Sequence, residues 1–277
     1  MVRSIVIGLD ESSQSMSTIA LGLRWARRCG ALLVGLGIID APTMRQPEPV
    51  PLGASHFKTE RDEVLVARAR RQVEQCLARF AVRCTEAGVA CKLLEEVGVP
   101  SAHLLLEAQR YDVLMLGQQS WGHFGTQGDP WATLTTVLKN APRPVVTVPE
   151  TLGDGTAVVV AYDGSVQAAR ALQAFEASGL AGADAVHIVS VGSEHSAAAR
   201  HADRAVEFLR LHNMVASPHV WSPSPSVAAV ILDQVRQHQA RLLVMGAYGQ
   251  PTLREFFLGS VTRTVLQHRQ VPLFLYH

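Results

Sequence analysis

Residues 158–165 read VVVAYDGS, a short apolar run that ends in Asp-Gly-Ser and is followed by an alanine-rich helical pattern. Residues 5–12 read IVIGLDES and have the same arrangement. An apolar run without polar alternation is typical of a strand buried on both faces of a parallel sheet. The repetition of strand, turn and helix indicates that the chain contains one α/β unit twice.

The later segments of the two halves also correspond. Residues 112–117 (DVLMLG) and 241–246 (RLLVMG) are apolar runs that end in glycine, and a proline-led strand closes each half. Alternation of strands and helices predicts doubly wound sheets with right-handed crossovers. We therefore expect two tandem α/β domains, each with a five-stranded parallel sheet, with strands near 4–9, 32–38, 90–95, 112–117 and 144–148 and near 157–162, 185–191, 216–221, 241–246 and 272–276.

The first half is longer than the second. Its extra residues lie around 41–61, a proline-rich stretch that reads as an extended loop and that we interpret as a lid or an interface loop. A long helical pattern follows near 60–88, where the second half has a shorter helix near 196–212. Glycines and polar residues at 149–155 read as a linker, which predicts domains at 1–150 and 155–277.

Composition excludes several classes of protein. The 277 residues carry a formal net charge of +1, so there is no basic field for nucleic acid. The four cysteines form no CxxC pair, and no apolar run reaches the roughly 20 residues that span a bilayer. No signal peptide is visible. We expect a soluble, cytoplasmic protein that contacts neither nucleic acid nor membrane.

The eleven histidines show no metal-binding spacing, so the sequence predicts no metal site. We read His187 as a satisfied core or edge residue of a strand. We read His201 and His212, which share one predicted helix, as part of a solvated face.

The second half contains a glycine motif that could bind a phosphate group. Gly246 and Gly249 follow a buried strand, and after nine further residues come Gly259 and Ser260 at a helix start. Glycines allow backbone to approach a ligand closely, and a helix N-terminus offers unpaired N–H groups to a phosphate. The alternative is a simple glycine turn in which Ser260 serves as the helix N-cap.

This G-x2-G-x9-G-S pattern, together with Asp-Gly-Ser after the opening strand, resembles the ATP-binding branch of the universal stress protein family. The resemblance covers both halves and implies a tandem universal stress protein of the Rossmann-like, adenine nucleotide α-hydrolase-like fold. It implies ATP as ligand, with Mg²⁺ within reach of the Ser260 and Thr262 hydroxyls. The implied binding residues are Asp163 and Val191 for adenine and ribose, and Gly246, Gly249, Gly259 and Ser260, followed by Val261 and Thr262, for the phosphates. The alternatives are an Asx-type helix cap for Asp163 and a plain core valine for Val191.

The first half departs from the pattern. Trp131 and Ala132 stand where Gly259 and Ser260 stand, Ser120 replaces Gly249, and Asp129 adds negative charge. We expect this degenerate domain to bind ATP weakly or not at all, and Asp10 to serve as a cap.

Three functions remain open. The leading hypothesis is a nucleotide-responsive stress protein that acts as a sensor or regulator. The others are a nucleotide-free interaction scaffold and a slow ATP hydrolase. The chain has no P-loop and no G-x-S-x-G elbow, and we name no catalytic residue. The resemblance also implies that the closing strands of two domains pack together, here as an intramolecular pseudo-dimer, with a homodimer of whole chains also open.

Overall fold

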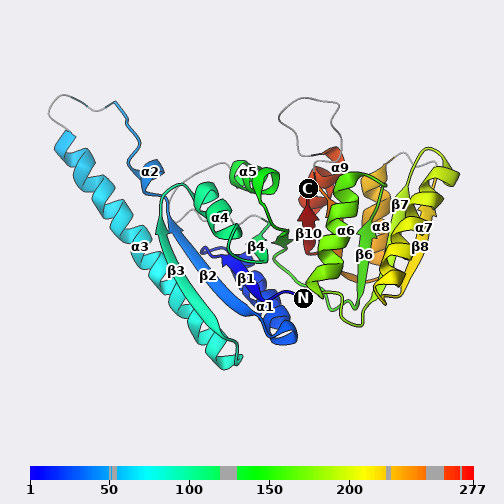
Figure 1. Cartoon of the computed structure of the whole chain (residues 1–277). Helices are drawn as coiled ribbons and strands as arrows, with labels where there is room; N and C mark the ends of the chain where they lie inside the picture. Colours follow the sequence, from blue (N-terminus) through cyan, green and yellow to red (C-terminus); the bar gives the residue numbers. More distant parts are fainter. Residues whose placement is uncertain (50, 52–54, 119–129, 223–225, 248–258, 269) are drawn as a thin grey trace. The chain divides into compact units, whose positions relative to one another are not determined.

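The computed structural model describes the whole chain except residues 50, 52–54, 119–129, 223–225, 248–258 and 269 (Figure 1). Two compact units are present. The N-terminal unit comprises Arg3–Pro142, and the C-terminal unit comprises Arg143–His277 together with Met1–Val2. No helix in the described parts of either unit is long and apolar enough to cross a membrane.

The N-terminal unit has four parallel strands in the order β3-β2-β1-β4. Residue pairs such as Val6 and Val34 set the register of the two central strands. The elements of the unit are β1 (Ser4–Gly8), α1 (Ser13–Cys29), β2 (Leu32–Ile39), α2 (Ala41–Met44), α3 (Ser55–Glu86), β3 (Cys91–Val97), α4 (Pro100–Ala108), β4 (Val113–Gly117) and α5 (Pro130–Asn140).

The C-terminal unit has the strand order β5-β10-β9-β6-β7-β8. All neighbours are parallel except β5 and β10, whose antiparallel register pairs Val146 with Phe274. The closing strands of the two repeats therefore pair with each other, as the resemblance implied. The elements are β5 (Val145–Val148), β6 (Ala157–Ala161), α6 (Val166–Ser178), β7 (Ala185–Val191), α7 (His195–Leu211), β8 (Ala216–Trp221), α8 (Val227–Gln237), β9 (Ala240–Gly246), α9 (Ser260–His268) and β10 (Leu273–Tyr276).

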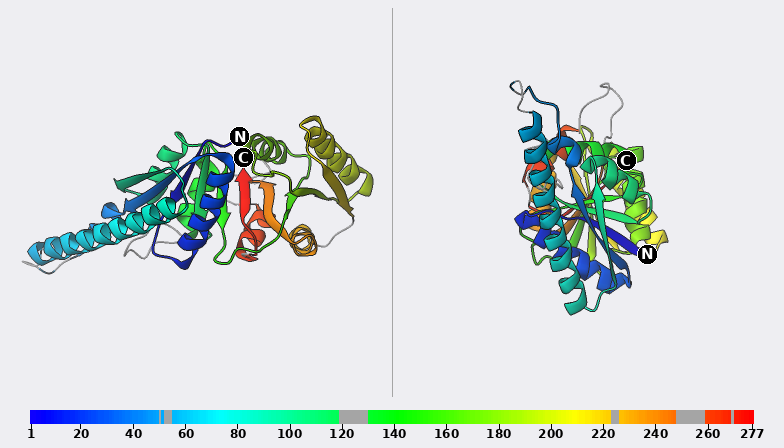
Figure 2. Two further views of the ribbon diagram at one scale, coloured as in Figure 1. Left: turned by 90° about the horizontal axis from the view of Figure 1, so that it is seen from below. Right: turned by 90° about the vertical axis from the view of Figure 1, so that its left-hand side faces the viewer.

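Helices cover both faces of each sheet (Figures 1 and 2). In the C-terminal unit α6 contacts α7 and α8 contacts α9, while α6 packs on β9 and α8 on β7. In the N-terminal unit α4 contacts α5, and the long helix α3 lies along β2 and β3. Right-handed crossovers on either side of the first strand produce this double winding.

Local sequence signals begin and end the helices. The Ser165 hydroxyl oxygen accepts the N–H of Ala168 at the start of α6, and Gly179 ends this helix with a φ of 69°. Gly30 ends α1 in the same left-handed conformation, with a φ of 65°. The Ser226 hydroxyl caps α8. Serine at N-caps and glycine after the last turn satisfy the backbone groups that a helix leaves free.

Each unit has its own apolar core. Phe80 of α3 is fully buried against the N-terminal sheet, beside β2. In the C-terminal unit Phe175 of α6 and Phe274 of β10 are fully buried and pack edge to face, with ring centroids 5.9 Å apart. Such edge-to-face pairs are favoured over flat stacking because of the ring quadrupole.

The predicted doubly wound α/β class is confirmed, and all ten predicted strands are present with ends within two residues of their predicted bounds. The extended loop expected at 41–61 is partly wrong. The Asp40 carboxylate accepts the N–H of Thr43 and begins the short helix α2, and α3 already starts at Ser55. The predicted linker 149–155 lies in the irregular segment between β5 and β6. The units separate at Arg143 instead, because β5 pairs with β10. The predicted bounds 1–150 and 155–277 therefore mark the two sequence repeats and do not coincide with the two compact units.

Candidate functional site

A pocket of about 280 Å³ opens at the carboxyl ends of β6 and β7. Ligands in doubly wound sheets bind outside the carboxyl ends of strands. The walls come from the residues after β6, the end of β7 with the following loop, and the first turns of α7: Tyr162, Asp163, Ser190, Val191, Gly192, Ser193, Glu194, Ala197, Ala198 and His201.

Asp163 has a local role and also faces the pocket. Its Oδ1 accepts the N–H of Ser165 at 2.9 Å, which is the Asx-type turn named as the alternative role. The residue is exposed, and among the described residues no hydrogen bond engages Oδ2. One carboxylate oxygen therefore holds the turn while the other is available to accept a hydrogen bond from a ligand.

The turn after Asp163 requires glycine. Gly164 has a φ of +78°, and a Cβ there would lie 2.1 Å from Nδ1 of His201. The His201 ring is thus held against the Asp163–Gly164 turn. Its Nδ1 is buried and has no hydrogen-bond partner within the described structure. The expectation that His201 belongs to a solvated face is wrong, because α7 directs it toward β6. His212, which directly follows the last residue of α7, is exposed as expected.

Val191 is half-buried and lines the pocket, so it is not a plain core valine. Beside it, the Ser190 hydroxyl donates to the Tyr162 carbonyl at 2.6 Å and joins the ends of β6 and β7. Burial, reinforced by the negative charge of Asp163, raises the pKa of the Tyr162 phenol. The phenol therefore stays neutral at physiological pH.

Gly246 ends β9, next to β6, and has a packing reason to be glycine. A Cβ there would lie 2.6 Å from the backbone nitrogen of Ala168 and 2.7 Å from the carbonyl carbon of Gln167. The first turn of α6 thus approaches the strand end too closely for any side chain. This contact accounts for Gly246 without any ligand.

The start of α9 differs from the expected cap. The Arg263 N–H donates to the Gly259 carbonyl at 2.9 Å, so Gly259 occupies the N-cap position and Ser260 the first helical position. The reading of Ser260 as the N-cap is therefore wrong. The N–H groups of residues 260–262 have no acceptor inside the helix, because a helix leaves its first N–H groups unpaired. Among the described residues, a Cβ on Gly259 would meet only Thr262 Oγ1, at 3.9 Å.

The structure brings only part of the predicted set together. Asp163 and Val191 share the pocket, whereas Gly246, Gly259, Ser260, Val261 and Thr262 are not among its lining residues. Ser260 is exposed, Val261 half-buried and Thr262 buried. Gly249 lies outside the described residues. Sequence reasoning missed Glu194 and His201, which carry no local motif and reach the pocket only because α7 packs beside β7.

The corresponding position in the N-terminal unit is closed. Asp10 is only 8% exposed, and its Oδ1 accepts both the N–H and the hydroxyl of Ser12, at 2.9 and 2.6 Å. Ser12 is the N-cap residue of α1, so Asp10 holds the turn before the helix and is not the cap that was expected. Helix α3 covers this turn: Cys76 contacts the Asp10 carbonyl and Gln72 donates to Glu11. The two units are expected to differ at Trp131 and Ala132, which replace Gly259 and Ser260. They also differ at the turn after the first strand, where Asp10 is buried and Asp163 is exposed.

The comparisons with known proteins agree on one family. Residues 156–277 match the model of the universal stress protein family. A curated universal stress protein of Synechocystis sp. is 26% identical over 286 residues, which cover 99% of this chain and 100% of the relative. A crystal structure of a universal stress protein from Archaeoglobus fulgidus has a TM-score of 0.69 and 18% identity, with coverage of 99% of this chain and 97% of that chain. A putative universal stress protein from Pseudomonas aeruginosa has a TM-score of 0.58 and 15% identity, with coverage of 99% and 93%. These two structures share the tandem fold over the full chain.

Proposed function

We propose that the C-terminal unit, whose residues 156–277 match the model of the universal stress protein family, binds an adenine nucleotide, with ATP as the ligand, and acts as a sensor or regulator. The observation that carries the proposal is the pocket at the ends of β6 and β7, where Oδ2 of Asp163, beside Val191, accepts no hydrogen bond from the described residues. A ribose hydroxyl would donate to Asp163 Oδ2, and the base would pack on Val191 and the alanines of α7.

The volume and charge of the pocket favour a nucleoside over a whole nucleotide. About 280 Å³ is near the lower end of the roughly 300–1,000 Å³ typical of ligand pockets. Asp163 and Glu194 both line the pocket, and two carboxylates would repel phosphate. The phosphates must therefore leave the pocket toward a more positive region.

The start of α9 supplies such a region. Residues 260–262 present N–H groups that have no acceptor inside the helix, together with the positive end of the helix dipole, and among the described residues a Cβ on Gly259 would meet only Thr262 Oγ1. The hydroxyls of Ser260 and Thr262 would serve the phosphates or a Mg²⁺ ion bound to them. The N-terminal unit, with Asp10 covered and Trp131 at the helix start, would bind no nucleotide. It would serve as the structural partner of an intramolecular pseudo-dimer.

The decisive measurement is nucleotide binding by the whole chain. Denatured protein is assayed by chromatography for released nucleotide, and ATP is then titrated into nucleotide-free protein by calorimetry. Asp163→Asn keeps the acceptor for the Ser165 N–H and removes the acceptor for the ligand. Loss of one hydrogen bond to a charged group predicts a roughly 10- to 150-fold rise in Kd. Asp154→Asn, which changes the same charge at an exposed linker position, should leave Kd unchanged.

Gly259→Trp tests the phosphate end by installing the residue of the first repeat. It should abolish ATP binding, whereas Gly153→Trp, at a glycine where an added Cβ has nothing within 4 Å, should not. Absence of ATP binding at millimolar concentration would refute the proposal, and an unchanged Kd for Gly259→Trp would refute the site. Steady-state ATP hydrolysis, measured on the same protein, separates a sensor from a slow hydrolase.

A further inference from the structure

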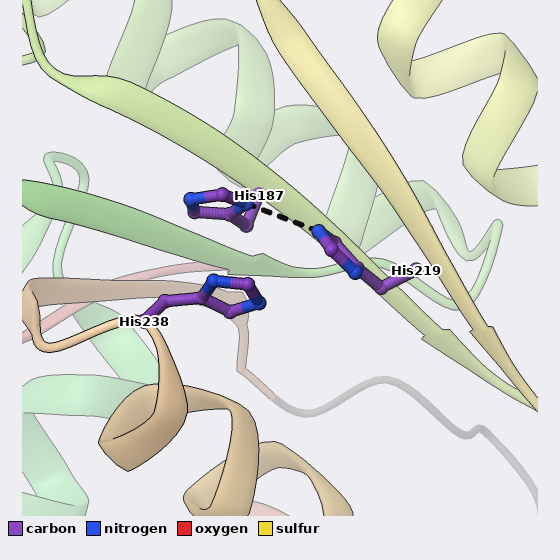
Figure 3. Close-up of side chains that lie close together, drawn as sticks. All are labelled: His187, His219 and His238. Atoms are coloured by element: carbon purple, nitrogen blue, oxygen red, sulfur yellow. Dashed lines mark hydrogen bonds between the residues drawn. The ribbon is translucent and has the colours of Figure 1, made fainter.

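Three histidines converge on one face of the C-terminal sheet (Figure 3). His187 lies on β7, His219 on β8, and His238 directly follows α8. One ring nitrogen from each residue lies within 4.8 Å of those of the other two. Nδ1 of His187 and Nε2 of His219 are 3.0 Å apart, and the rings of His187 and His238 are stacked with centroids 3.7 Å apart.

The register of the sheet produces this convergence. His187 pairs with Ser217 and His219 pairs with Val189, so the two histidines are two positions apart on neighbouring strands. Side chains two positions apart point to the same face of a sheet. Helix α8 covers this face and ends at Gln237, so that His238 lies between the helix and the start of β9.

A hydrogen-bonded chain holds the third ring. The Gln234 side chain, which is 1% exposed, donates from Nε2 to Gln237 Oε1 at 2.8 Å. This contact turns Gln234 Oε1 toward Nε2 of His238, at 3.2 Å. Because an amide oxygen can only accept, Nε2 of His238 is the donor in this contact, and the neutral form of the ring then has its lone pair on Nδ1. Histidine ligands of metals characteristically donate their other ring N–H to such an acceptor.

We propose that His187, His219 and His238 form a binding site for a divalent transition metal ion, Zn²⁺ in the first instance. Imidazole nitrogen is a preferred ligand of Zn²⁺, and three histidines leave the fourth tetrahedral position to water. In the metal-free protein one of the two facing nitrogens of His187 and His219 carries its ring's proton. When the metal ion binds, that ring takes its other neutral tautomer, with the proton on the second ring nitrogen, so both facing nitrogens offer a lone pair to the ion. Binding brings all three nitrogens to about 2.0–2.1 Å from the ion, so the His238 ring turns out of its stacked position.

Two further properties fit metal binding. All three rings are half-buried, so an ion can reach them from solvent. Burial, reinforced by the neighbouring imidazoles, lowers the pKa of His187 and of His219. Both rings are therefore neutral at pH 7, and the neutral imidazole is the form that binds a metal.

The site is separate from the proposed nucleotide pocket. His187 precedes the pocket residue Val191 by four positions, about 13 Å along an extended strand. His238 precedes β9, so the cluster lies toward the amino ends of the strands. A bound ion would tie the outer strand β8 to β7 and to the end of α8. Its binding does not depend on the nucleotide proposal.

The test uses the full chain after treatment with a chelator and gel filtration. Zn²⁺ is titrated in competition with a chromogenic chelator, and Co²⁺ is added separately as a spectroscopic probe. We expect one Zn²⁺ per chain and the intense visible absorption of four-coordinate Co²⁺. His219→Gln and His238→Gln should each raise the Kd for Zn²⁺ at least about tenfold and abolish the Co²⁺ band. His212→Gln removes an exposed histidine of the same unit and should change neither.

The thermal midpoint provides a second reading, because an ion that binds only the folded state stabilises it. Zn²⁺ should raise the midpoint of the wild type and of His212→Gln but not that of His219→Gln. X-ray absorption of the Zn²⁺-loaded wild type should show three imidazole ligands, and this result does not depend on how any variant folds. Absence of saturable Zn²⁺ binding, a shell without histidine, or equal affinity in His212→Gln and His219→Gln would each overturn the proposal.

Discussion

Replacement of Gly246 by alanine separates a packing role from a ligand role at the end of β9. The added Cβ would lie 2.6 Å from the Ala168 nitrogen and 2.7 Å from the Gln167 carbonyl carbon. Both atoms belong to the backbone of the first turn of α6, so no side-chain rotation relieves the clash. Either the strand end or the helix must shift.

Overpacking of this kind costs about 1–3 kcal/mol, which corresponds to roughly a 5- to 150-fold change in an opening equilibrium. The C-terminal unit should bear this loss, because α6 packs on β9 within it. Hydrogen exchange followed by mass spectrometry resolves the two units in the whole chain. Peptides from β6, α6 and β9 should exchange faster in Gly246→Ala, whereas peptides from β1 and β2 should be unchanged.

Gly153→Ala provides the matched control. A Cβ at Gly153 meets nothing within 4 Å, so its exchange pattern should equal that of the wild type. Equal exchange for Gly246→Ala and Gly153→Ala would refute the packing argument. The presence of glycine at position 246 would then be explained by close approach of a ligand and not by packing.

Two further predictions concern the cores and the thiols. Phe175→Ala removes a fully buried ring from the contact with Phe274, so the free energy of unfolding of the C-terminal unit should fall by about 3–5 kcal/mol in a denaturant titration; a loss below 1 kcal/mol would contradict the described packing. Burial, reinforced by the neighbouring Cys91, raises the pKa of the Cys84 thiol to about 12, whereas Cys91 is exposed. Because only the thiolate reacts, iodoacetamide at pH 8 should modify Cys91 and spare Cys84 in the native protein, and peptide mapping that finds equal modification of both would contradict this prediction.

Much of the fold follows from local pattern. The repeated apolar runs predict the ten strands, because a strand buried on both faces must be apolar throughout. The same reasoning places Asp163 at the carboxyl end of a strand, the family resemblance adds Val191, and the structure brings both into one pocket. The hydrogen-bonded turn at Asp10 is also a local property, since its partner Ser12 is two residues away.

Tertiary structure alone decided the remaining features. Glu194 and His201 enter the pocket because α7 packs beside β7, and α3 covers Asp10 because it lies along the other sheet. Position 246 must be glycine because the first turn of α6, some eighty residues earlier in the chain, leaves no room for a side chain. His187, His219 and His238 carry no spacing motif, so the sequence predicted no metal site. Strand register and the end of α8 bring them together, because contacts between elements depend on packing and not on sequence separation.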